Sequence, residues 1–261
     1  MNILETIIEQ KKVEVEKRRS VVPVAELEQQ KFFGRQSLSL KTALLDQTKT
    51  GIIAEFKRRS PSKGMINAAA DVGNVTAAYT ENGASALSVL TDEYFFGGST
   101  YDLLQARVNA IPVLRKDFII DEYQVMETKA MGADIILLIA ACLTPAKVKA
   151  LSILARRLQL EVLLEIHNEG ELQHICDEID LVGINNRNLK TFEVDINLSV
   201  ELSSRIPPGK VIIAESGIND TAVIKILKAS GFKGFLMGEK FMREADPAEA
   251  FKQFVQQLKQ T

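Results

Sequence analysis

Charged side chains lie at the end of a short apolar stretch early in the chain, where they could take part in acid–base chemistry. Glu55 interrupts the apolar run that begins at Ile52, and Lys57 follows that run. A carboxylate and an ammonium group are therefore two residues apart. In a strand, residues two apart point to the same side, and buried charges are costly unless they are paired or used. A solvated strand end would explain one such pair, and so would an acid and a base held in a catalytic site.

The same arrangement recurs along the chain, where polar residues end four further apolar runs. These residues are Lys116, Glu165, Asn185 with Arg187 two positions on, and Glu215. Any one of them could be a solvated strand end, but five runs that end in this way favour an active site. If the strands are parallel neighbours, three carboxylates, two ammonium groups and an amide converge on one opening.

The apolar runs alternate with amphipathic segments from Gly51 onward, which is typical of a parallel α/β fold. We expect strands at residues 52–57, 86–91, 111–116, 134–139, 161–165, 180–185, 210–215 and 233–238. We expect helices at about 70–82, 99–109, 121–131, 144–158, 168–178, 195–204, 219–229 and 247–260. Eight strands close a TIM barrel, and the first turn, KRRSPS, lacks the glycine pattern of a doubly wound open sheet. We therefore predict a single (β/α)8 barrel as the catalytic domain, residues 51–261.

Residues 1–50 read as a helical extension in front of the first strand. An amphipathic helix is predicted from Ile3 through Arg19, and two shorter ones at 24–30 and 39–47. A barrel of eight strands is complete without them, so this extension could plug its amino-terminal end as a stabilising device.

Composition and charge exclude several classes of protein. With 261 residues, 46% of them hydrophobic, the chain can bury one large core, and a net charge of −2 gives no drive toward nucleic acid or anionic membranes. The basic run at 57–63 lacks interleaved aromatic residues. No signal-type segment opens the chain, and the longest apolar run, 135–143, is too short to span a bilayer. We expect a soluble, cytoplasmic protein with neither nucleic-acid nor membrane partners.

Cysteine and histidine usage argues against disulfides and metals. Cys142 and Cys176 are too few for a disulfide framework and read as small core residues. His167 and His174 are the only histidines, and neither shows a partner at the spacing of metal ligands. We therefore predict no metal site.

Two loops suggest how a substrate is held. Ser216-Gly217 and Gly238 follow the last two predicted strands, a place where barrels frequently bind phosphate through backbone N–H groups and helix N-termini. A phosphorylated substrate is the expectation, although glycine at a strand end is also a plain turn residue. The aromatic loop at 94–98 is either a wall for an aryl group or ordinary packing on the barrel rim.

Five motifs in order along the chain resemble indole-3-glycerol phosphate synthases. They are IAEFKRRSPSKG at 53–64, LRKDFIID at 114–121, LLEIHN at 163–168, GINNRNL at 183–189 and AESGI at 214–218. The resemblance implies a (β/α)8 barrel of tryptophan biosynthesis that closes the indole ring of 1-(2-carboxyphenylamino)-1-deoxyribulose 5-phosphate and releases carbon dioxide and water. It also implies that the extension, residues 1–50, folds over the catalytic opening.

The resemblance assigns roles by motif. Lys116 would be the general acid and Glu165 the general base, and the remaining catalytic positions would orient and polarise the substrate: Glu55, Lys57, Asn185 and Glu215. Substrate and phosphate contacts would come from Ser60, Arg187, Ser216, Gly217, Gly238 and Phe118. Glu239 departs from the pattern, because a carboxylate cannot donate to a phosphate where a hydroxyl could.

No cofactor is expected, since an iminium-like anilino nitrogen in the substrate can take up the electrons of decarboxylation. The expected partner is the phosphorylated small molecule alone, and a monomer is the expected assembly. Two other readings stay open. Another sugar-phosphate barrel enzyme, an isomerase or a cyclase, would more naturally place acids or a cysteine at the opening. A non-catalytic phosphate-binding barrel would have little use for Lys116 facing Glu165.

Overall fold

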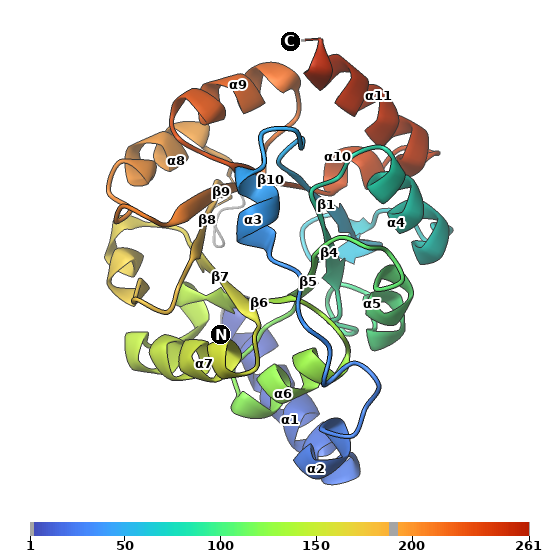
Figure 1. Cartoon of the computed structure of the whole chain (residues 1–261), viewed down its shortest axis with the longest axis vertical. Helices are drawn as coiled ribbons and strands as arrows, with labels where there is room; N and C mark the ends of the chain where they lie inside the picture. The colour runs from blue at the N-terminus through green and yellow to red at the C-terminus, as the bar shows by residue number, and fades with distance from the viewer. Residues whose placement is uncertain (1–2, 188–192, 261) are drawn as a thin grey trace.

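Eight parallel strands close into a barrel in the computed structural model, which describes residues 3–187 and 193–260 (Figure 1). The strands are β1 (Ile52–Phe56), β4 (Ala86–Leu90), β5 (Val113–Lys116), β6 (Ile135–Ile139), β7 (Glu161–Ile166), β8 (Leu181–Asn185), β9 (Val211–Glu215) and β10 (Gly234–Met237). Each pairs in parallel with its neighbours, and β1 pairs with β10 to complete the ring. The predicted TIM barrel is confirmed, with strand ends displaced by one or two residues. Pro112 has no N–H to donate, and β5 begins after it.

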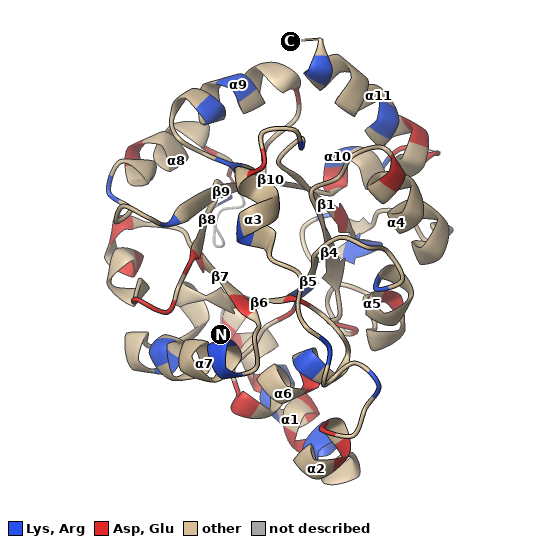
Figure 2. Cartoon of the chain, in the orientation of Figure 1, with Lys and Arg blue, Asp and Glu red and all other residues tan. Residues whose placement is uncertain are grey.

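Seven α-helices form the outer ring, and each begins at a residue whose side chain accepts an N–H of the first turn. They are α4 (Val72–Glu81), α5 (Thr100–Ala106), α6 (Glu122–Ala130), α7 (Pro145–Arg157), α8 (Ile196–Ser203), α9 (Thr221–Ala229) and α11 (Pro247–Lys259). Their caps are Asp71, Ser99, Asp121, Thr144, Asp195, Asp220 and Asp246. Lysines, arginines and acidic residues are interspersed over the helices in this view (Figure 2). None of the helices in the described part of the chain could cross a lipid bilayer.

The helix expected at 168–178 is wrong: the segment forms a 3-10 helix, η2 (Glu169–His174). A ring nitrogen of His174 lies 3.0 Å from the carbonyl oxygen of Glu171, and the N–H of Ile175 bonds to Leu172, three residues back. Gly170 further disfavours an α-helix here. Four short elements were not predicted. They are the hairpin strands β2 (Arg59–Ser60) and β3 (Gly64–Met65), the 3-10 helix η1 (Ala140–Cys142), and α10 (Glu239–Met242).

Alternation along the strands decides which side chains enter the barrel. Ile53 belongs to the interior cluster, whereas Ile52 and Phe56 pack outward against the helices. Leu114 and Leu163 fill the interior two residues before Lys116 and Glu165. Polar residues that follow on the same face therefore lie at the carboxyl-end opening of the barrel.

The last helix of the extension, α3 (Leu40–Leu45), closes the amino-terminal end of the barrel. Leu40 and Leu44 are buried in the same cluster as the barrel interior. Glu161, at the start of β7, accepts the hydroxyl of Ser39 at 2.5 Å and the N–H groups of Leu40 and Lys41 at 2.7 and 3.1 Å. Figure 1 shows α3 lying across the centre of the ring.

The first helix, α1 (Ile3–Val21), lies at the opposite end and is joined to α3 through α2 (Val24–Leu27). Its Lys11 is 0% exposed, and its Nζ lies 2.9 Å from Asp92 Oδ2 and 3.0 Å from Asp117 Oδ1. Both aspartates follow the carboxyl ends of strands, β4 and β5. The extension therefore contacts both ends of the barrel, through α3 at the amino-terminal end and through α1 at the carboxyl end.

Candidate active site

A cavity of about 320 Å³ opens at the carboxyl ends of the strands. Every site residue predicted from the sequence lies in its lining. These are Glu55, Lys57, Ser60, Lys116, Phe118, Glu165, Asn185, Arg187, Glu215, Ser216, Gly217 and Gly238. Helix α1 contributes Ile3, Leu4 and Ile7 to the same lining, three residues that the sequence analysis did not name as site residues.

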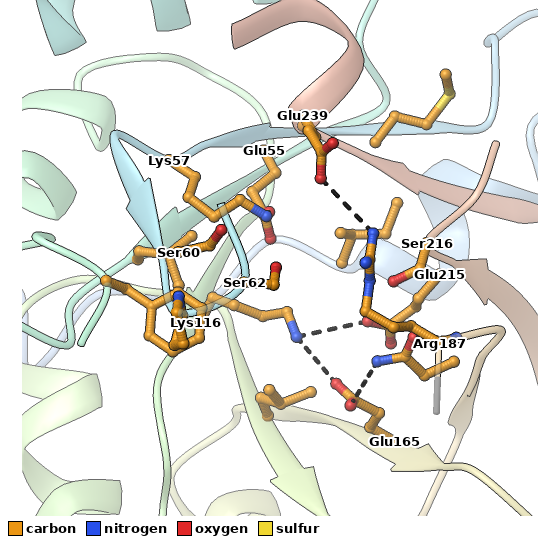
Figure 3. Close-up of a pocket in the computed structure, with 18 of the residues that line it drawn as sticks. Glu55, Lys57, Ser60, Ser62, Lys116, Glu165, Arg187, Glu215, Ser216 and Glu239 are labelled. Atoms are coloured by element: carbon orange, nitrogen blue, oxygen red, sulfur yellow. Dashed lines mark hydrogen bonds and ion pairs between the residues drawn. The ribbon is translucent and has the colours of Figure 1, made fainter. Parts of the chain in front are cut away.

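Lys116 is the centre of a buried cluster of charges. Its Nζ lies 2.9 Å from Glu165 Oε2 and 3.4 Å from Glu215 Oε2, and Figure 3 shows the side chain extended toward both carboxylates. Asn185 donates an amide N–H to the other oxygen of Glu165 at 2.9 Å. On β1, Lys57 Nζ pairs with Glu55 Oε1 at 2.7 Å. Side chains from β1, β5, β7, β8 and β9 thus meet at one place.

The environment makes the two carboxylates beside Lys116 unequal. Burial raises the pKa of a carboxyl group, but at Glu165 the charges of Lys116 and His167 and the hydrogen bond from Asn185 outweigh burial and hold the pKa well below its usual range. At Glu215, burial and the charges of Glu165 and Glu55 outweigh Lys116 and raise the pKa. Burial opposes the ammonium of Lys116, yet the surrounding glutamates raise its pKa. Glu165 is therefore held ionised, with a lone pair free to accept a proton, whereas Glu215 holds a proton more readily.

The turns after β9 and β10 bring backbone close to the cavity. Ser216 and Gly217 both have positive φ, 65° and 73°, and a Cβ on Gly217 would lie 2.3 Å from Val194 Cγ1. Gly238 immediately precedes α10, and its carbonyl oxygen accepts the N–H groups of Phe241 and Met242 at 3.0 and 2.9 Å. The Glu239 carboxylate lies 3.6 Å from Arg187 Nη2 across the cavity (Figure 3).

The close approach of Gly238 to the side chain of Glu55 leads to a prediction. A Cβ at Gly238 would lie 2.8 Å from Glu55 Cβ and 2.9 Å from its Oε1. We expect Gly238→Ala to displace Glu55 and its partner Lys57 and to lower kcat/KM by about 10- to 100-fold, while circular dichroism shows an intact fold. Gly34→Ala is the matched control, because a Cβ at Gly34 meets no atom within 4 Å. Equal activities of the two variants would contradict the prediction.

Aromatic and aliphatic side chains form one wall of the cavity. The Phe96 ring lies 6.0 Å from that of Phe118, and both line the cavity beside Ile7. Tyr94 is 63% exposed and Phe95 is buried, so the aromatic loop divides between packing and the cavity wall. Asp92 Oδ1 accepts the N–H groups of Phe95 and Phe96 at 2.8 and 3.1 Å. The aspartate that binds Lys11 therefore also fixes this wall, which suits a flat aryl group.

The sequence analysis missed the carboxylate partners of His167. His167 Nε2 lies 3.0 Å from Glu165 Oε1, and its Nδ1 lies 3.3 Å from Glu171 Oε2. The sequence signal that could have indicated these contacts is the presence of glutamates two residues before and four residues after this histidine. Ser60 Oγ is buried in the lining, with no hydrogen-bond partner among the described residues. No group of three potential metal ligands gathers in residues 3–187 and 193–260.

Comparison with known proteins adds sequence and fold relatives. A family model described as indole-3-glycerol phosphate synthase matches residues 4–254. Proteins named indole-3-glycerol phosphate synthase from Bacteroides thetaiotaomicron and from Polaromonas sp. are 46% and 44% identical to this chain. Those matches cover 98% of the chain and 99% of the Bacteroides protein, and 97% of each chain in the Polaromonas pair.

Solved structures with low identity share the fold. Tryptophan synthase subunit alpha from Legionella pneumophila aligns with a TM-score of 0.60 at 13% identity, over 85% of this chain and 97% of its own. KGPDC from Streptococcus mutans aligns with a TM-score of 0.61 at 12% identity, over 80% of this chain and 97% of its own. At such identities the likeness extends to the barrel architecture alone.

Proposed function

The chain belongs to the indole-3-glycerol phosphate synthase family, and from that premise we propose which of its residues carry out the reaction. The family's enzymes are carboxy-lyases of tryptophan biosynthesis that act on 1-(2-carboxyphenylamino)-1-deoxyribulose 5-phosphate. They form indole-3-glycerol phosphate with loss of carbon dioxide and water. The observation that carries our assignment is the buried pair of Lys116 and Glu165, 2.9 Å apart, between an aromatic wall and two glycine turns.

Lys116 is the general acid in this proposal. The aryl carbon that carries the carboxylate attacks the ketone carbon, and the ketone oxygen takes a proton from the Lys116 ammonium as the new bond forms. The anilino nitrogen becomes iminium-like and receives the electron pair of the bond to the carboxylate, which departs as carbon dioxide. The substrate itself therefore supplies the electron sink, and the scheme needs no cofactor.

Glu165 is the general base of the second half of the reaction. Loss of the hydroxyl as water requires a proton at the departing oxygen, which Lys116 supplies once solvent has reprotonated it, and removal of a proton from the neighbouring ring atom. Glu165 lies beside Lys116 and is held ionised, so it is suited to accept that proton. Asn185, Glu215 and the Glu55–Lys57 pair orient the substrate around these two groups.

The phosphate and the aryl group bind at opposite sides of the cavity in this proposal. Ser216, Gly217 and Gly238 offer backbone N–H groups for the phosphate, and Arg187 and Ser60 lie within reach of substrate oxygens. Phe118 packs against the aryl ring. One chain supplies every group of the scheme, which supports a monomer as the working unit, with residues 51–261 as the catalytic domain and 1–50 as its extension.

Formation of product tests the assignment directly. Adding the anilino ketose phosphate should raise indole fluorescence with time and release one carbon dioxide per product. A barrel of another sugar-phosphate reaction, or one that only binds a phosphate ligand, would show neither signal.

The phosphate site leads to a second prediction. Inorganic phosphate or sulfate should raise Tm by mass action, relative to chloride at equal ionic strength. We expect Gly217→Leu to raise KM about tenfold or more, because the side chain would collide with Val194 and deny the phosphate its close N–H contacts. The anion protection should disappear in the same variant. Unchanged KM together with intact protection would place the phosphate elsewhere.

A further inference from the structure

His167 occupies the position immediately after β7 and lies between two carboxylates. Its Nε2 is 3.0 Å from Glu165 Oε1 and its Nδ1 is 3.3 Å from Glu171 Oε2. The side chain is only 8% exposed. Within the described part of the chain, Nε2 makes no aligned hydrogen bond. Its 3.0 Å distance from the Glu165 carboxylate is nevertheless that of an ion pair.

The carboxylate of Glu171, on the side of the His167 ring away from Glu165, is held in place by hydrogen bonds. Glu171, in η2, accepts the backbone N–H of His167 at 2.7 Å through Oε2 and the Asn168 amide at 2.8 Å through Oε1. A neutral imidazole has one N–H and one lone pair, so one of its nitrogens would turn a lone pair toward a carboxylate oxygen. An imidazolium carries an N–H on both nitrogens and suits both neighbours. The geometry therefore selects the charged ring.

We propose that His167 is a positioning residue for the reaction: as an imidazolium anchored by Glu171, it keeps Glu165, and not Glu215, as the ionised partner of Lys116. The inference rests on the proposed role of Glu165 as the general base. Lys116 alone is shared between the two carboxylates, at 2.9 and 3.4 Å. His167 adds a second cation to one side only and thereby makes the two glutamates unequal.

The groups around Glu165 are consistent with this role. Lys116 of β5 and Asn185 of β8 contact the carboxylate, and Glu215 of β9 lies on the other side of Lys116. Cys142 of η1 is a neutral thiol, because burial and the charges of Glu165 and Glu171 raise its pKa. Burial disfavours the imidazolium, yet the carboxylates of Glu165 and Glu171 on either side of the ring outweigh it and raise the pKa of His167 to about 10.

The test is the pH dependence of kcat/KM in His167→Asn, and in particular its acid limb, the range in which activity falls as pH is lowered. Removing a cation 3.0 Å from Glu165 raises the pKa of that base, so activity should begin to fall at a pH about one unit higher or more as pH is lowered. Glu171→Gln should shift the limb in the same direction by less. His174→Asn is the matched control, because its ring bonds only to backbone carbonyls of Glu171 and Leu143 among the described residues.

A limb that moves no further in His167→Asn than in His174→Asn would overturn the proposal, since a merely structural histidine lowers activity equally at every pH. A second measurement does not depend on turnover. In nitrogen-15 spectra of labelled protein, the His167 ring should stay doubly protonated well above neutral pH. The midpoint of the His167 titration should lie at a lower pH in Glu165→Gln. A midpoint near the ordinary value of about 6.5, or one unchanged in Glu165→Gln, overturns the coupling.

The two proposals fail separately. If Glu165→Gln retained most of its turnover, Glu165 would not be the base, and the His167 midpoint would still report whether the two side chains are coupled. If Glu165→Gln were inactive while the His167 midpoint stayed ordinary, the base assignment would stand and the role of His167 would be wrong.

Discussion

We expect Lys116→Met to lose turnover and to keep its fold. Methionine retains the length of the lysine stem above Leu114 but has no proton to give, so kcat should fall by about 10² or more while KM changes far less. Glu165→Gln keeps the shape of the side chain and can accept no proton, and the same loss is expected. Steady-state kinetics with indole fluorescence gives both numbers.

The stability of Lys116→Met depends on pH in a way that the structure specifies. Without the ammonium, Glu165 retains His167 and Asn185 as partners, and Glu215 keeps a proton because its pKa, already raised, rises further. A carboxyl whose folded pKa lies above its unfolded value binds its proton more tightly when folded, so stability falls as pH increases through that range. Urea unfolding should therefore show little change at mildly acidic pH and a marked loss at alkaline pH.

Lys57→Met measured beside Lys116→Met decides which lysine is the acid. In the parent enzyme kcat should fall at low pH as Glu165 protonates and at high pH as Lys116 loses its proton. The pKa of Glu165 is lowered and that of Lys116 is raised, so the plateau between the limbs should be broad. If Lys116→Met kept most of its turnover and Lys57→Met were inactive, the acid role would belong to Lys57.

Two truncations of the extension should fail in different ways. Deleting residues 1–22 removes α1 with its cavity-lining Ile3, Leu4 and Ile7. It also removes Lys11, the ion-pair partner of Asp92 and Asp117. Because the rest of α1 is removed as well, these two aspartates become solvated and are not left buried without a partner. We expect a folded barrel with KM raised about tenfold or more.

Deleting residues 1–45 also removes α3, and the barrel interior then opens at its amino-terminal end. Leu40 and Leu44 are both buried, and each contributes about 1.5–3 kcal/mol by its burial. Glu161 loses its three donors as well. Unfolding or aggregation is expected, as measured by circular dichroism and light scattering. A stable 1–45 deletion, or a 1–22 deletion with normal KM, would contradict these assignments; Lys11→Met in the full chain is the control for the loss of one charge.

Strand residues could be placed from the sequence because their environment is local and periodic. Glu55, Lys116 and Glu165 each follow an inward-facing apolar residue by two positions, and this alternation alone puts them at the opening. The number of strands then determined the barrel.

Features that depend on contacts between distant segments could not be predicted. Lys11 reads as one more solvated charge on an amphipathic helix, yet two aspartates about 80 and 105 residues away bury it. The Phe96 side chain lines the cavity because Asp92, itself held by Lys11, directs its loop. The expected helix near Glu171 failed because side-chain contacts to its carbonyl group favoured a tighter turn.

The closure of the amino-terminal barrel end by α3 has a consequence for synthesis on the ribosome. Leu40 and Leu44 emerge early, but the interior they cover is complete only when β10 has paired with β1. Until β10 has been synthesised, these leucines have no complete partner surface, and such contacts between remote parts of a chain form slowly. Nascent chains should therefore carry an exposed apolar segment that chaperones can bind, and should be catalytically silent until β10 has paired with β1.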